Sequence, residues 1–174
     1  MSGKGILFDF DGTLVPNLDL ADMRRQIAEM AAAAGVPDDV HAGLYIVEII
    51  EASQAWLLEQ HGGEASLSNQ YAADSHQRIH DIEMQAAGKT RLFDDARRVL
   101  IQLRSADYRL GIVTRNCREA VMTMFPDMNE YIDCLHARDD VEYLKPDPRH
   151  LQANLDALGA DPALSVMVGD GALD

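Results

Sequence analysis

The chain has 174 residues, of which 47% are apolar, and its 15 Lys and Arg residues against 29 Asp and Glu residues give a net charge of −14. This length and apolar fraction suit one globular domain, with or without an insert, and exclude a wholly disordered or coiled-coil chain. The negative charge argues against DNA, RNA or anionic lipid as a main partner, because it repels phosphate groups over the whole surface.

Cysteine usage and hydropathy give a first expectation about the cellular location. Cys117 and Cys134 do not form a close Cys-X-X-Cys pair, so neither a disulfide scaffold nor a zinc knuckle is expected. No apolar run approaches the roughly 18 residues of a membrane span, and the first residues leave no room for the apolar core of a signal peptide. We therefore expect a soluble cytoplasmic protein without a nucleic-acid or membrane partner, as a monomer or weak homodimer.

Four short apolar runs are typical of buried parallel strands, because each has about the length of a central strand and ends in a polar residue. These runs are residues 5–8, 110–113, 133–136 and 165–168. Amphipathic helical patterns lie between the later runs, at residues 96–103 and 151–158. The alternation of strands and helices predicts an α/β fold with a parallel sheet.

Local signals predict where two of the helices begin. Asp147 and Pro148 have the pattern of an N-cap followed by proline at the first helical position, and Gly159 suits the C-terminal stop of that helix. Asn116 and Glu119 have the spacing of a capping box before a further helix at 121–125.

A long stretch after the first strand shows helical patterns without strands. Apolar side chains recur at helical spacing over residues 20–34, residues 40–58 are apolar around much of a helix circumference, and residues 71–86 outline a third helix. The predicted division is an inserted all-α domain, residues 17–88, in a core made of residues 1–16 and 89–174.

Charged and polar residues follow the predicted strands, at the edge of a parallel sheet where ligands bind. Asp9 and Asp11 follow the first strand, Thr114 the second and Asp170 the fourth, while Lys145 lies in the segment after the third. Carboxylates suit Mg²⁺, which takes hard oxygen ligands and is completed by phosphate oxygens. With the metal bound, Asp9 can attack phosphorus while Lys145 offsets charge on the transferring group.

The spacing of the first two aspartates assigns them different tasks. A regular strand would place Asp9 and Asp11 on one face. The Gly12-Thr13 turn allows Asp11 to point away from the metal, toward the leaving oxygen. Asp11 is therefore the candidate general acid and base.

Four segments together resemble the motifs of the haloacid dehalogenase superfamily, in its phosphoglycolate-phosphatase-like branch with a helical cap inserted after the first motif. They are FDFDGTL at 8–14, IVT at 112–114, KP at 145–146 and VGDGALD at 168–174. The resemblance covers essentially the whole chain and implies a Rossmann-like three-layer core, with residues 17–88 as the cap over the active site. It also implies that a strand and helix after Asp174 are missing.

The resemblance implies a role for each residue that matches a motif. Asp9 matches the nucleophile and Asp11 the acid/base. Thr114 matches the residue that hydrogen-bonds the phosphoryl oxygens, and Lys145 matches the one that orients the nucleophile and neutralises charge.

The resemblance also implies Mg²⁺ as cofactor. Its ligands would be the carboxylate of Asp9, the main-chain carbonyl of Asp11 and the carboxylate of Asp170, with Asp174 near or behind that shell.

The second motif departs from the family pattern. Many cap-bearing members have Asn directly after the Thr, whereas here Arg115 intervenes and Asn116 is displaced by one position. We keep Arg115 and Asn116 as candidate phosphate-binding residues, since a guanidinium can supply a charged fork. The alternative is a surface Arg115 with Asn116 as a helix N-cap.

These residues predict a Mg²⁺-dependent phosphatase that hydrolyses a small-molecule phosphomonoester through an aspartyl-phosphate. The carboxylate at Asp11 separates the chain from the dehalogenases and phosphonate-cleaving members of the family, which lack it. A sugar phosphomutase would use the same residues and stays an alternative. Two further alternatives are a phospho-accepting signalling domain and a binding protein with a degraded site. Signalling domains of that kind place their acidic pair first and their phospho-accepting Asp on a middle strand, and they have no helical insert of this size.

Overall fold

The computed structural model of the protein describes residues 3–172 and 174. The chain divides into two compact units: one runs to Leu18 and resumes at Glu83, and the other comprises Asp19–Ile82. The second unit lies inside the predicted insert, 17–88, and its role as a cap stays a prediction. Over the part of the chain that is described, no helix is both long enough and apolar enough to cross a membrane.

Residues 3–172 and 174 contain a four-stranded parallel sheet with the order β3-β2-β1-β4. The strands are β1 (Lys4–Phe8), β2 (Tyr108–Val113), β3 (Cys134–His136) and β4 (Val166–Val168). Each ends at the residue where the sequence predicts the end of an apolar run. Phe8 of β1 lies opposite Ile112 of β2 and Val168 of β4, so the segments after these strands start at one edge. The predicted α/β fold is confirmed.

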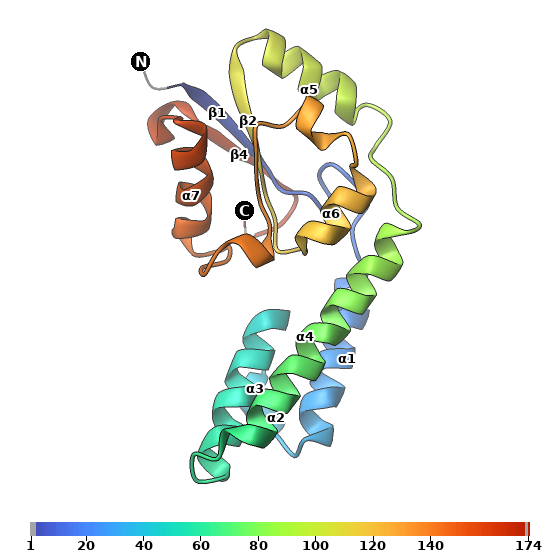
Figure 1. The fold of residues 1–174 in the computed structure, drawn as a ribbon, viewed down its shortest axis with the longest axis vertical. Coiled ribbons are helices and arrows are strands. Elements are labelled where there is room, and N and C mark those ends of the chain that lie inside the picture. Colours follow the sequence, from blue (N-terminus) through green and yellow to red (C-terminus); the bar gives the residue numbers. More distant parts are fainter. Residues whose placement is uncertain (1–2, 173) are drawn as a thin grey trace. The chain divides into compact units, whose positions relative to one another are not determined.

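Helices cover both faces of the sheet (Figure 1). They are α5 (Ala96–Ser105), α6 (Arg118–Met124) and α7 (Pro148–Leu158). The 3-10 turns η1 (Met128–Glu130) and η2 (Arg138–Asp140) lie before and after β3, and η3 (Pro162–Leu164) lies between α7 and β4. Figure 1 shows α7 on one side of the sheet and α5 and α6 on the other. Leu7 and Val113 pack with the buried leucines of α7, whereas Ile112 packs in the core that includes α5 and α6. This alternation follows from the two-residue period of a strand.

The predicted ends of α7 are confirmed. The side chain of Asp147 accepts the N–H of Arg149 at 2.9 Å, and Pro148 occupies the first helical position. Gly159 ends the helix at φ +59°, in the left-handed region that glycine enters without steric cost.

The predicted capping box at Asn116 and Glu119 is wrong. Helix α6 begins at Arg118, and its N-cap is Cys117, whose Sγ accepts the N–H of Ala120 at 3.4 Å. Asn116 precedes the cap, because its side chain is bonded to the N–H of Cys117 and to a carboxylate of the site described below.

The helical unit is built from α1 (Leu20–Ala33), α2 (Asp38–His41), α3 (Ile46–Gln60) and the part of α4 (Ala65–Ala87) that ends at Ile82. Met23 and Ile27 of α1 are buried, as are Ile49 and Ile50 of α3, so apolar faces pack within the unit. A continuous helical run over 40–58 was expected and is wrong. The chain leaves α2 before Gly43, whose φ of +79° is incompatible with a right-handed helix, and α3 starts afterwards.

Candidate active site

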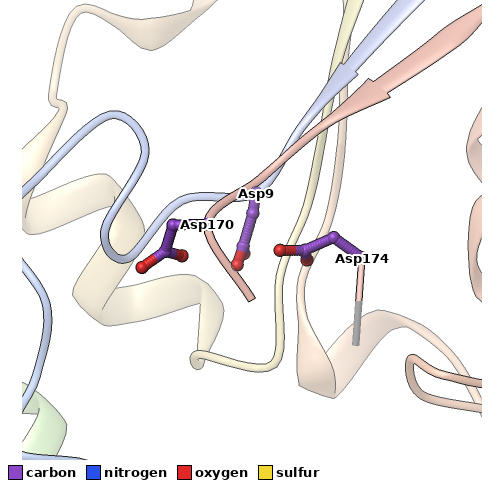
Figure 2. A group of neighbouring side chains, drawn as sticks. All are labelled: Asp9, Asp170 and Asp174. Atoms are coloured by element: carbon purple, nitrogen blue, oxygen red, sulfur yellow. The ribbon is translucent and has the colours of Figure 1, made fainter. Parts of the chain in front are cut away.

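Three carboxylates meet where β1 and β4 end (Figure 2). Asp9 follows β1, while Asp170 and Asp174 lie in the segment after β4, and oxygen atoms of all three lie within 4.8 Å of one another. The two segments start side by side, because the N–H of Asp9 donates to the carbonyl of Val168 at 2.8 Å. Strand pairing thus joins residues that are far apart in the sequence.

Two glycines leave room for these carboxylates. A Cβ at Gly12 would lie 2.2 Å from Oδ2 of Asp170, and a Cβ at Gly169 would lie 2.0 Å from Oδ2 of Asp174. The same oxygen of Asp170 accepts Nδ2 of Asn17 at 2.8 Å. The sequence analysis did not identify Asn17, because no motif marks a residue that orients a carboxylate more than a hundred positions away.

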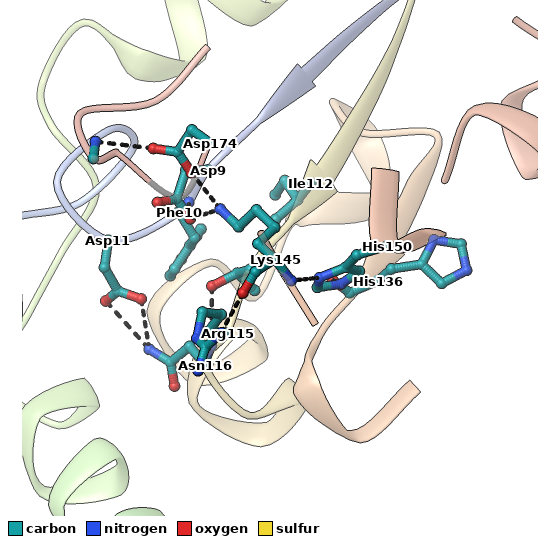
Figure 3. Close-up of polar contacts among 12 residues, drawn as sticks. Asp9, Phe10, Asp11, Ile112, Arg115, Asn116, His136, Lys145, His150 and Asp174 are labelled. Atoms are coloured by element: carbon teal, nitrogen blue, oxygen red, sulfur yellow. Dashed lines mark hydrogen bonds and ion pairs between the residues drawn. The ribbon is translucent and has the colours of Figure 1, made fainter. Parts of the chain in front are cut away.

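Lys145 supplies a buried positive charge to the site (Figure 3). The residue is 1% exposed, and its Nζ lies 3.0 Å from Oδ1 of Asp9 and 2.5 Å from Oδ1 of Asp174. A buried ammonium is stable only when charges and hydrogen bonds compensate for its lost hydration. Lys145 is therefore fixed directly beside the candidate nucleophile.

Burial and the contacts with Lys145 together shift the pKa values of Asp9 and Asp174. Burial raises the pKa of Asp9 above its ordinary value, although the charge and hydrogen bond of Lys145 work in the opposite direction. Burial also works to raise the pKa of Asp174, but the hydrogen bonds from Lys145 and from the N–H of Gly171 outweigh it, so this pKa is lowered. Asp174 is thereby held as a carboxylate next to the cation.

Asp11 is turned toward a different partner. Nδ2 of Asn116 lies 3.0 and 3.2 Å from the two carboxylate oxygens of Asp11, and Figure 3 shows the two side chains facing each other. The expected turn is present, since the carbonyl of Phe10 accepts the N–H of Thr13 at 3.3 Å and Gly12 has a φ of +79°. Burial raises the pKa of Asp11 to about 7, against the hydrogen bond from Asn116. A carboxyl group in this state can hold a proton near neutral pH.

The loop after β2 brings the remaining predicted residues to the site. Thr114 is buried, and its Oγ1 accepts the N–H of Asn116 at 3.1 Å. The guanidinium of Arg115 donates to the main-chain carbonyl of Lys145. Asn116 is 3% exposed, and the N-cap alternative for this residue is wrong, because Cys117 is the N-cap of α6. Phosphate binding by Thr114, Arg115 and Asn116 stays a prediction.

His150 is a second residue, after Asn17, that the sequence did not indicate. His150 is fully buried in the first turn of α7, and its Nδ1 accepts the main-chain N–H of Lys145 at 3.1 Å. Burial lowers the pKa of His150 to about 4, so its ring is neutral near pH 7. The sequence offers no motif for His150, because it shares its helical face with a second polar residue, Asn154, as well as with leucines.

The donor set fits Mg²⁺. Asp9, Asp170 and Asp174 offer hard carboxylate oxygens, the donors that this ion prefers. The spaces left by Gly12 and Gly169 are filled by two of these carboxylates and would be lost to any larger residue. A single ammonium beside the three carboxylates leaves negative charge that a divalent cation would offset.

Gly12→Ala is expected to lower both the Tm and the rise in Tm that Mg²⁺ produces. The new Cβ must displace Asp170, and a φ of +79° costs an L-residue about 1–2 kcal/mol. Gly35→Ala is the matched control, because Gly35 has a φ of +85° but a Cβ there would meet no described atom within 4 Å. Thermal unfolding with and without Mg²⁺ compares the variants, and equal Mg²⁺ responses would contradict the close approach at Gly12.

Comparison with known proteins links this geometry to one family. Residues 4–174 match the model of the haloacid dehalogenase-like hydrolases. The chain is 27% identical over 171 residues to pyrophosphatase PpaX of Bacillus velezensis, an alignment that covers 95% of this chain and 73% of the relative. It is also 26% identical to a plasmid-encoded phosphoglycolate phosphatase of Cupriavidus necator, in an alignment of 181 residues that covers 97% of this chain and 73% of the relative.

The fold is also found among solved structures. A haloacid dehalogenase-like hydrolase from Bacteroides fragilis superposes with a TM-score of 0.65 at 24% sequence identity, covering 98% of this chain and 80% of that one. This likeness concerns the fold, and it agrees with the parallel sheet and flanking helices described above.

Proposed function

Because the chain belongs to the haloacid dehalogenase-like hydrolase family, we propose that it is a Mg²⁺-dependent phosphatase acting on a small phosphorylated metabolite. The observation that carries the proposal is Nζ of Lys145 at 3.0 Å from Oδ1 of Asp9, beside the carboxylate group. This cation gives a phosphoryl group a local counter-charge, despite the net charge of −14. The names of the relatives, a pyrophosphatase and a phosphoglycolate phosphatase, support a phosphorylated substrate.

The metal site would be formed by the carboxylates of Asp9, Asp170 and Asp174. The resemblance to the family adds the main-chain carbonyl of Asp11. When bound, Mg²⁺ offsets the charge of the carboxylates and of the phosphoryl oxygens, so that these groups can approach one another.

The first step transfers the phosphoryl group to the protein. A carboxylate oxygen of Asp9 attacks phosphorus, the bond from phosphorus to the leaving oxygen breaks, and Asp11 gives its proton to that oxygen. Oγ1 of Thr114 accepts the N–H of Asn116 through a lone pair. Its hydroxyl proton can therefore be donated to a phosphoryl oxygen. Lys145 offsets the charge that develops on the group in transfer. The products are a free alcohol and an aspartyl-phosphate at Asp9.

The second step releases phosphate and restores the site. Water attacks the phosphorus of the aspartyl-phosphate, Asp11 accepts a proton from that water, and the bond between phosphorus and the Asp9 oxygen breaks. Inorganic phosphate leaves, Asp9 is again a carboxylate and Asp11 again an acid. The hydrogen bonds of Asn116 hold the Asp11 carboxyl in one orientation between the two steps.

Asp11→Asn is expected to lower the turnover of substrates with poor leaving groups by about 10²–10⁴-fold, the usual contribution of general acid–base catalysis. An amide cannot give a proton to the leaving oxygen or take one from water. Rapid-quench measurements should show a smaller deficit in the first step for p-nitrophenyl phosphate, whose leaving group needs no proton. Wild-type rates with an alkyl phosphate would remove Asp11 from this role.

The proposed function is tested by phosphate release from a panel of phosphomonoesters and pyrophosphate in the presence of Mg²⁺. At least one compound should release phosphate well above the background of Asp9→Asn. No release from any compound would contradict a phosphatase of this class. Isomerisation of a sugar phosphate without release of phosphate would instead favour the phosphomutase alternative.

A further inference from the structure

Lys145 is held through its main chain as well as through its ammonium group. Its N–H donates to Nδ1 of His150 at 3.1 Å, and its carbonyl accepts the guanidinium of Arg115. Figure 3 shows His150 and Arg115 on the two sides of the Lys145 main chain. A lysine side chain has four rotatable carbon–carbon bonds, so the position of its main chain decides which sites its ammonium can reach.

His150 links Lys145 to the end of the sheet. Its second ring nitrogen, Nε2, lies 3.2 Å from the main-chain carbonyl of His136, the last residue of β3. The partners define the tautomer, because an amide N–H can only donate and a carbonyl can only accept. Nδ1 of His150 must therefore be the acceptor for Lys145, and Nε2 must carry the proton that it donates to His136.

The imidazole ring of His150 is enclosed by the protein and has no contact with solvent. His150 is 0% exposed, and it stands in the first turn of α7, the helix that packs on the sheet through Leu155 and Leu158. Both ring nitrogens are thus aimed at main-chain atoms, one on the strand end and one on the segment that carries Lys145. A hydrophobic residue would fill the same space without either bond.

We propose that His150 is a positioning residue that sets the Lys145 ammonium between Asp9 and Asp174, and thereby sets the affinity of the site for phosphate. This inference rests on the proposed phosphatase function and deepens it. His150 accepts the Lys145 main-chain N–H and so holds that main chain against the first turn of α7. Arg115 fixes the opposite polar atom of the same residue. Neither side chain needs to contact the substrate for this task.

Two substitutions separate the bond to Lys145 from the bond to His136. In His150→Asn, Oδ1 can take the place of Nδ1 and accept the Lys145 N–H, while the contact with His136 is lost. In His150→Gln, the longer side chain can reach His136 in place of Nε2, while the acceptor for Lys145 is lost. His150→Phe removes both bonds but keeps a ring of similar size.

The probe is inorganic phosphate, with binding to the Mg²⁺-loaded protein measured by calorimetry, beside thermal unfolding of each variant. Phosphate affinity should fall by about tenfold or more in His150→Gln and His150→Phe, as expected when a buried donor loses its acceptor. It should stay within about threefold of wild type in His150→Asn. His61→Gln, at an exposed turn in the helical unit, is the control and should bind as wild type does.

The outcomes distinguish this inference from the proposed function. Wild-type affinity in His150→Gln, or equal losses in His150→Gln and His150→Asn, would overturn the positioning role, because packing alone would then explain the histidine. If His150→Phe does not fold, the comparison of phosphate affinity between His150→Asn and His150→Gln still tests the positioning role. A wild-type protein that neither binds phosphate nor turns over any phosphomonoester would overturn the proposed function itself.

Discussion

Asp9→Asn is expected to lower the turnover of every phosphomonoester substrate by at least about 10⁴-fold, the order of loss when a covalent nucleophile is removed. An amide does not attack phosphorus, and it is a poorer ligand for a divalent cation than a carboxylate. The fold should persist, because Lys145 keeps its contact with Asp174 at 2.5 Å. Phosphate release measures the loss, and circular dichroism and the Tm confirm the fold.

The control for this variant is Asp94→Asn, an exposed aspartate of the same unit. It makes the same chemical change away from the site and should retain wild-type turnover. Intact-mass analysis after rapid quenching with substrate should show an added phosphoryl group on the wild-type protein and none on Asp9→Asn. Turnover at the wild-type rate in a clean Asp9→Asn preparation would rule out the covalent mechanism.

Removal of divalent cations should abolish turnover, and Mg²⁺ should restore it. Asp9, Asp170 and Asp174 lie within 4.8 Å of one another, and Lys145 alone does not neutralise them together with a phosphate ester. Ca²⁺ should bind but support turnover poorly, because its larger and looser coordination shell can misplace the attacking oxygen. Activity after chelation, and after addition of each ion, measures both effects.

Binding of Mg²⁺ has a readout that does not depend on turnover. An ion present at 100 times its Kd stabilises the folded state by about 2.7 kcal/mol, so the Tm of the wild-type protein should rise on addition of Mg²⁺. Asp170→Asn removes one ligand charge and should weaken this rise, while Asp94→Asn should not. Full turnover in excess chelator, or an unchanged Mg²⁺ response in Asp170→Asn, would contradict the proposed metal site.

The position of the charges explains how a strongly acidic chain can bind an anion. The net charge of −14 belongs to the chain as a whole, and water and salt screen those charges that lie on the surface. Lys145 is buried beside Asp9, where screening is weaker and a nearby cation counts for more. The local arrangement therefore decides which charge a phosphoryl group meets.

Much of the fold and the location of the site could be read from short segments. The strands are apolar runs bounded by polar residues, and the ends of α7 follow from Asp147, Pro148 and Gly159, whose effects act within one helical turn. Parallel strands place their carboxyl ends at one edge, so residues after separate runs could be expected to meet. Asp9 and Asp170 do lie together there.

Local patterns were less reliable where a side chain had a choice of partners. Asn116 and Glu119 have the spacing of a capping box, yet Asn116 bonds to Asp11, and Cys117 becomes the N-cap of α6. A spacing rule describes what a side chain can do within its own helix. It does not include a carboxylate brought there by another strand.

The partners that position the site were decided by the tertiary structure alone. Lys145 reaches Asp174 across 29 positions of the sequence, and Asn17 reaches Asp170 across 153. His150 bonds to His136 and Lys145 because α7 packs against the end of β3. The sequence by itself determined which residues can carry the chemistry, since residue type and local pattern limit that choice. Only the packing of the sheet and its helices decided which of them touch, because such contacts depend on the relative placement of segments that are distant in the chain.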